Sequence, residues 1–209
     1  MKSFALFSTF ILLIVTSCRD PKPVESVKAA LPKVLIKEIL VTSNGCQPDS
    51  DNCSYVQITY PEYTDSSAIR LNQLISDKIL LIGSDYFREG LPENIQTMAE
   101  SFVKDFEIFK ADYPDYNFGW YLQINAELIL DETDLVSLRI SSEAYTGGAH
   151  PNSNVRYLVI SSLSGQEMSL TDLVADTLAF KEATRLAFRQ QKGLADRQPI
   201  SDLGYFISD

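Results

Sequence analysis

The sequence predicts an α+β fold in which antiparallel sheet packs with helices in two small subdomains. Two regions, residues 34–60 and 122–161, contain segments that alternate apolar and polar residues, as half-buried strands do. Between these regions, apolar residues recur at helical spacing. The chain has 209 residues, of which 45% are hydrophobic, and this suffices for a core. A break at Pro114 divides it into an N-terminal subdomain, 34–114, and a C-terminal subdomain, 115–209.

The first residues predict export to the cell envelope. The apolar run Phe4–Val15 is too short to span a bilayer as a permanent helix. It leads into Val-Thr-Ser-Cys, a lipobox-like motif that ends at Cys18. We therefore predict a signal peptide at residues 1–17, lipidation of Cys18, and a tether at residues 18–33. The protein would then be lipid-anchored on the periplasmic face or the cell surface. A simple secretory signal with an incidental cysteine is the alternative.

The first two predicted strands, residues 34–42 and 54–60, form a hairpin. Cys46 and Cys53 lie in its connection, on either side of a run of turn-forming residues. With Cys18 lipidated, these two cysteines remain as a pair. Because an exported protein folds in an oxidising compartment, we predict a disulfide between them.

Two helices are predicted next. Asp65 or Ser66 caps the first, in which apolar residues repeat at helical spacing. The second begins at Leu91-Pro92, because proline fits the first turn of a helix, and the chain breaks again near Pro114. The predicted core face of this second helix is an aliphatic and aromatic stripe, namely Ile95, Ala99, Phe102, Phe106 and Phe109.

The C-terminal subdomain contains the clearest strand pattern. Its first two strands alternate apolar and polar residues over most of their length and predict an antiparallel hairpin with one buried and one solvated face. The predicted strands span residues 122–130, 136–141, 155–161 and 167–170. A last helix, residues 177–191, begins at an Asp176 cap and ends before Gly193. The predicted core-side residues of this helix are Phe180, Ala183 and Ala187.

The loop Tyr145–Pro151, which reads Tyr-Thr-Gly-Gly-Ala-His-Pro, is the candidate site and contains the only histidine of the chain. Adjacent glycines permit positive φ or a close backbone approach, and the proline restricts the residue before it. We predict that this loop and the strand before it bind a ligand through Glu143, Tyr145, Gly147, Gly148 and His150. The alternative is a tight strand connection, in which Tyr145 and His150 only brace the strands.

A family resemblance begins at the same loop. Tyr145, Gly147, Gly148, Ala149 and His150 resemble the Tyr-x-Gly-Gly-Ala-His signature of a bacterial envelope domain of unknown function. That domain forms the extracellular part of the lysozyme-sensing anti-sigma factor RsiV, and it also occurs beside the peptidoglycan deacetylase domain of PdaC. The resemblance implies a PdaC-like N-terminal subdomain and an RsiV-like C-terminal subdomain.

The chain departs from this family pattern at three places. Pro151 stands where glycine is usual, and Gln166 stands where lysine is usual. Because the family adds strands after its last helix, the resemblance also implies that the C-terminal subdomain is truncated at Asp209.

Charge and resemblance together predict a binding module. The net charge of -10 disfavours nucleic-acid partners and favours basic ones. Lysozyme or another basic protein, or peptidoglycan fragments, are therefore the predicted ligands. We predict no enzymatic activity, cofactor or metal, because the sequence shows one histidine and no nucleophile elbow, phosphate loop or metal-ligand cluster. Two alternatives remain, a cell-wall hydrolase that uses His150 and a structural envelope lipoprotein.

Overall fold

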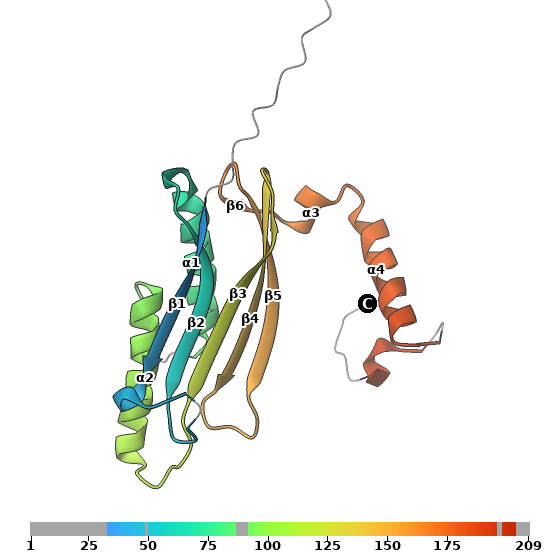
Figure 1. Ribbon diagram of the computed structural model, residues 1–209. Coiled ribbons are helices and arrows are strands. Elements are labelled where there is room, and N and C mark those ends of the chain that lie inside the picture. Colours follow the sequence, from blue (N-terminus) through green and yellow to red (C-terminus); the bar gives the residue numbers. More distant parts are fainter. Residues whose placement is uncertain (1–32, 49, 87–91, 196–197, 204–209) are drawn as a thin grey trace, which may run out of the picture.

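The computed structural model describes residues 33–48, 50–86, 92–195 and 198–203. Its strands form a six-stranded sheet in the order β1-β2-β3-β4-β5-β6 (Figure 1). The α+β class predicted from the sequence is confirmed. The predicted signal peptide, Cys18 and nearly all of the predicted tether lie outside the described residues.

The N-terminal strands form the predicted disulfide-linked hairpin. Strand β1 (Val34–Thr42) pairs antiparallel with β2 (Tyr55–Tyr63). A 3₁₀ turn, η1 (Ser43–Gly45), begins their connection. A disulfide joins Cys46 to Cys53, with 5.6 Å between their Cα atoms. The cross-link therefore lies at the end of the sheet where β1 ends and β2 begins.

Two helices follow the hairpin. A 3₁₀ turn, η2 (Ser66–Ala68), leads into α1 (Ile69–Ser84), and the Asp65 side chain accepts a hydrogen bond from the Ser67 N–H at 2.7 Å. Helix α2 (Ile95–Asp112) begins later than predicted. Asn94 and Thr97 form a capping box, in which each side chain accepts a hydrogen bond from the other's backbone N–H. This reciprocal cap, rather than Pro92, determines where α2 starts.

The remaining strands form a meander. Strands β3 (Tyr121–Asp131), β4 (Leu135–Tyr145), β5 (Asn152–Ser161) and β6 (Gln166–Glu167) pair antiparallel in succession. Strand β3 also pairs with β2, and that pairing is parallel. The difference from the predicted antiparallel sheet arises because α1 and α2 return the chain to the end from which β2 started. One mixed sheet therefore runs through both predicted subdomains.

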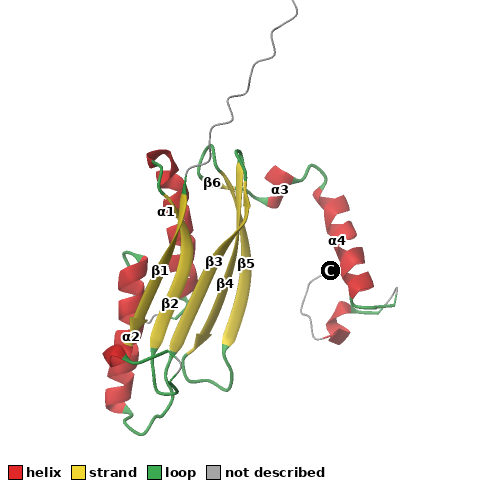
Figure 2. Ribbon diagram, viewed as in Figure 1, coloured by secondary structure: helices red, strands yellow, loops and turns green. Residues whose placement is uncertain are grey.

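The core lies between one face of this sheet and the two helices, α1 and α2 (Figure 2). Its largest fully buried side chains come from both halves of the chain, and they include Tyr63, Ile75, Met98, Phe102, Leu122, Leu138 and Ile160. Side chains on the opposite face, which we call the open face, are largely polar, for example the exposed residues Gln57, Asn125, Glu127 and Arg139. The predicted alternation of buried and solvated residues is confirmed in β4 and in most of β3, but Leu130 is exposed because the β3–β4 register shifts between Leu128 and Leu130.

The last helices do not add to this core. Helix α3 spans Leu170–Leu173, α4 spans Thr177–Gln191, and η3 spans Ile200–Leu203. The predicted bounds and Asp176 cap of α4 are confirmed. However, its predicted core-side residues, Phe180, Ala183 and Ala187, are exposed, and α4 stands apart from the sheet (Figure 1). Its buried residue is Arg189, whose guanidinium donates hydrogen bonds to the carbonyls of Ala195 and Gln198. Among the described helices, none has both the length and the apolar character needed to cross a bilayer.

Candidate functional site

Three tyrosines lie side by side at one end of the open face. Tyr145 ends β4 and is in register with Tyr121, the first residue of β3, which is in register with Tyr55 at the start of β2. The ring centroids of Tyr55 and Tyr121 are 5.6 Å apart, and those of Tyr121 and Tyr145 are 6.1 Å apart. Their planes differ by 14° and 28°, so the rings are nearly parallel. We call Tyr55, Tyr121 and Tyr145 the tyrosine row.

Hydrogen bonds hold this row in place. The Tyr121 hydroxyl donates to Oε1 of Glu143 at 2.7 Å, and the Ser153 hydroxyl reaches Oε2 of the same carboxylate at 3.4 Å. Gln123 donates to the Tyr55 hydroxyl at 3.0 Å. Burial and, to a smaller extent, the hydrogen bond to Glu143 and the nearby negative charges together raise the pKa of Tyr121 to about 12. The Tyr121 hydroxyl therefore remains a protonated donor at neutral pH.

The tyrosine row forms one side of a pocket of about 240 Å³. We call it the aromatic pocket, and its lining comprises the tyrosine row, Pro48, Ser50, Asp51, Cys53, Phe118 and Gly119. The disulfide therefore fixes one wall of the pocket, because Cys53 and its preceding loop residues belong to it. A Cβ atom on Gly119 would lie 1.8 Å from the Cys53 carbonyl oxygen. Only glycine allows the backbone to approach the disulfide loop this closely.

The two adjacent glycines of the candidate loop differ from each other. Gly147 has φ of +96°, and a Cβ atom there would lie 2.8 Å from the Tyr116 hydroxyl and 3.6 Å from Nε1 of Trp120. Both of these polar atoms are buried. Gly148 has no such restriction, since its nearest neighbour, the His150 carbonyl, is 3.8 Å from a Cβ placed there. Gly147 is thus the structurally demanding position of the loop.

His150 lies at the surface of the candidate loop. Its side chain is exposed, and its Nδ1 lies 3.0 Å from the carbonyl oxygen of Pro151. The hydroxyl of Ser153, three residues after His150, is hydrogen-bonded to Glu143. Among the described residues, no group of three or more His, Cys, Asp or Glu side chains is arranged to hold a metal ion.

The structure thus brings Glu143 and Tyr145 together and leaves His150 outside their contacts. Sequence analysis missed Tyr55, Tyr121 and Asp51. The predicted strands included Tyr55 but not Tyr121, and the alternating pattern contained no information on which strands are neighbours.

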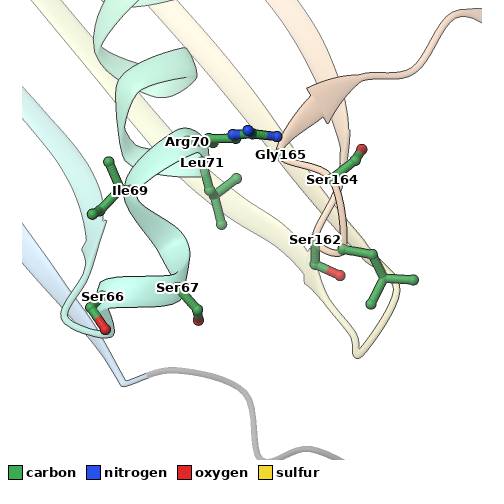
Figure 3. Close-up of a pocket in the computed structure, with 9 residues that line it drawn as sticks. Ser66, Ser67, Ile69, Arg70, Leu71, Ser162, Ser164 and Gly165 are labelled. Carbon is green, nitrogen blue, oxygen red and sulfur yellow. The ribbon is translucent and has the colours of Figure 1, made fainter.

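A second cavity, of about 440 Å³, lies at the opposite end of the sheet. Figure 3 shows Arg70 and Leu71 of α1 beside the β5–β6 turn at Ser164 and Gly165, with Ser66 and Ser67 below them. None of the residues predicted as a binding site lines this cavity. We therefore assign the candidate site to the aromatic pocket.

Comparison with known proteins places this geometry in context. The family model described as "Deacetylase PdaC" matches residues 47–153, the segment from the disulfide loop through the candidate loop. No curated protein matches the chain.

Two solved structures share the fold. One is a DUF3298 family protein from Pseudomonas aeruginosa PAO1, with 21% identity, a TM-score of 0.56, and coverage of 78% of this chain and 67% of that one. The other is a member of the DUF3298 family from Bacteroides fragilis NCTC 9343, with 20% identity, a TM-score of 0.57, and coverage of 84% and 75%. At these identities the likeness concerns the fold alone.

Proposed function

Because the chain belongs to the family described as Deacetylase PdaC, we propose that it is a lipid-anchored binding module of the cell envelope. Its recognition surface is the tyrosine row with Glu143. The single observation that carries this proposal is the aromatic pocket itself, where three half-buried tyrosines are held on a rigid sheet beside a disulfide-fixed loop. Aromatic side chains presented rigidly are typical anchors of protein interfaces.

The position of the pocket suits a tethered module. Strand β1 begins at Val34, directly after the predicted tether, and runs for nine residues to Thr42, the register partner of Tyr55. At about 3.3 Å per residue, the tyrosine row lies about 30 Å from the point where the tether enters. Figure 1 shows the strand-β4 to strand-β5 connection and the disulfide loop at the end of the sheet opposite that point. A protein anchored through Cys18 would present this end away from the membrane.

The ligand we favour is a basic protein of the lysozyme type. The net charge of -10 would attract such a protein and orient it as it approaches. Glu143, held beside the tyrosine row, adds a local negative charge to the anchor. The resemblance to the lysozyme-sensing ectodomain supports the same class of ligand.

Peptidoglycan fragments are the second candidate. The observation that favours them is the small volume of the pocket, about 240 Å³, which suits a small group better than a whole protein surface. We propose binding rather than turnover in both cases. Support for this comes from His150, whose side chain faces its neighbouring carbonyl rather than a nucleophile.

Surface plasmon resonance tests the favoured ligand. Immobilised protein with its disulfide intact should bind lysozyme, and binding should weaken as salt screens the charges. Tyr145→Ala should speed dissociation by roughly tenfold, which corresponds to loss of about 1.4 kcal/mol. Tyr157→Ala is the matched control, because Tyr157 is an exposed tyrosine of the same face on β5, outside the pocket.

Two outcomes would contradict this proposal. The first is the absence of lysozyme binding at high micromolar concentration, which would leave peptidoglycan fragments as the candidate to test. The second is release of soluble muropeptides or acetate by the pure protein, lost on His150→Ala, which would establish the hydrolase alternative.

A further inference from the structure

We propose that the aromatic pocket binds an ammonium group, of the kind at the end of a lysine side chain. This inference rests on the proposed function and specifies which chemical group of the ligand the recognition surface binds. It is carried by three observations, namely the rings of the pocket, the carboxylates of Asp51 in its lining and of Glu143 beside it, and its size.

Four aromatic rings line the pocket. They are the tyrosine row and Phe118, which comes from the segment between α2 and β3. The face of an aromatic ring carries a negative electrostatic potential, and a cation near such faces is attracted to each of them. Because Tyr121 is stacked between Tyr55 and Tyr145, the rings of the pocket that can offer a face to a cation are Tyr55, Tyr145 and Phe118.

Two carboxylates supply net negative charge without a built-in cation. Asp51 lines the pocket, and Glu143 accepts the hydrogen bond of Tyr121, one of its rings. Other acids of the described sheet are paired, for example Glu62 with Lys37 and Glu127 with Arg139. Within the described residues, neither Asp51 nor Glu143 forms a salt bridge with a lysine or arginine. The described lining of the pocket contains no lysine or arginine either. The negative charge there is consequently available to a cation from outside.

The size of the pocket limits what enters it. Its volume of about 240 Å³ is below the roughly 300–1,000 Å³ of sites that enclose whole small molecules. A single alkyl-ammonium side chain is a group of the size that this space accommodates. We assign the ammonium group to a lysine of the basic protein partner, and an amine of a peptidoglycan stem peptide is the other source of the same chemistry.

The first experiment measures charge dependence directly. The full-length lipidated protein in detergent is titrated with Nα-acetyl-lysine amide and with its neutral Nε-acetylated analogue, and binding is followed by ligand-observed NMR. The charged probe should bind more tightly by roughly fivefold or more, as expected for a cation held by aromatic faces. Equal binding of the two probes would overturn the inference, whatever the variants show.

Matched variants then separate cation recognition from simple filling of an apolar space. Tyr145→Leu and Asp51→Asn should each reduce the preference for the charged probe, whereas Tyr145→Phe should retain it because the ring remains. Tyr157→Leu, outside the pocket, should change nothing. The inference would also be refuted if the Tyr145→Leu variant bound the charged probe as tightly as the unaltered protein.

A second pair of measurements separates this inference from the proposed function. Lysozyme with acetylated lysines should lose most of its affinity, whereas a stem peptide with a free amine should bind only if peptidoglycan is the source. Binding of native and acetylated lysozyme with the same affinity would refute the ammonium site and leave the binding module intact. Selective binding of the lysine probe without lysozyme binding would refute the protein partner and leave the site intact.

Discussion

Gly147 shows how one residue shapes the candidate loop. Its φ of +96° is unfavourable for any residue with a Cβ, and that Cβ would also press on the Tyr116 hydroxyl. We expect Gly147→Ala to lower the free energy of unfolding by about 2 kcal/mol, measured by urea denaturation. Gly148→Ala is the matched control and should cost less than about 0.5 kcal/mol. Equal losses at the two positions would show that the loop does not depend on this backbone conformation.

Individual site residues were predictable only where the chain itself brings them together. Glu143 and Tyr145 were predicted together because they are close in sequence, and in β4 they lie two residues apart and therefore on the same face. Tyr55 and Tyr121 belong to different strands, and their neighbourhood depends on a parallel register between distant segments. His150 was predicted as a site residue because it is the only histidine of the chain. The sequence does not show that its ring contacts the neighbouring Pro151 carbonyl.

The disulfide loop is the element with the clearest energetic consequence. Cys46 and Cys53 are seven residues apart, and closing a loop of that length stabilises the folded state by about 2.5 kcal/mol in the chain-entropy model. We expect the double substitution Cys46→Ala, Cys53→Ala to lower the free energy of unfolding by about this amount, measured by urea denaturation. It should also weaken ligand binding, because Cys53 and its loop form a wall of the aromatic pocket.

Reduction of the unaltered protein provides the matching control for the double variant. Both samples lack the cross-link, so their unfolding midpoints should agree. Two free thiols in the natively exported protein would contradict the assignment of this pair.

Elements were predicted well where their ends are set by local chemistry. The last helix has the expected limits because Asp176 caps its first turn and Gly193 follows its last, with φ of +65°. The start of α2 was missed, because the Asn94–Thr97 capping box outweighed the proline signal. What α4 packs against could not be deduced, since an amphipathic pattern identifies an apolar face but not its partner.

At the scale of the whole molecule, the proposal depends on the anchor. The sequence before the described residues predicts lipidation of Cys18. We expect Cys18→Ala to move the protein from the membrane fraction to the soluble fraction, as shown by immunoblotting of separated fractions. A serine-to-alanine change at Ser3, outside the lipobox, is the control and should leave the protein in the membrane fraction. A Cys18→Ala protein that stays in the membrane fraction with an intact Met1 would rule out this anchor.

The fold class could be predicted from periodicity alone, because half-buried strands and amphipathic helices each have a characteristic spacing of apolar residues. That all strands belong to one sheet could not be predicted in this way. Pro114 marks a real end of helical structure just after Asp112, but the strands on either side of it lie in one sheet. A pattern along the chain cannot show that β2 and β3 are neighbours when two helices separate them.

The parallel pairing of β2 with β3 also sets the order in which the protein can fold. The hairpin of β1 and β2 can form as soon as it is made, but the other edge of β2 remains unpaired until residues 121–125 arrive. Bringing these distant segments together costs loop-closure entropy before their contacts form, so we expect this step to limit the folding rate. Until then Val56 and Ile58, both completely buried in the native protein, remain on an open strand edge. If the chain is exported as its N-terminal sequence predicts, the hairpin emerges before β3, and it then needs protection from aggregation until β3 pairs with it.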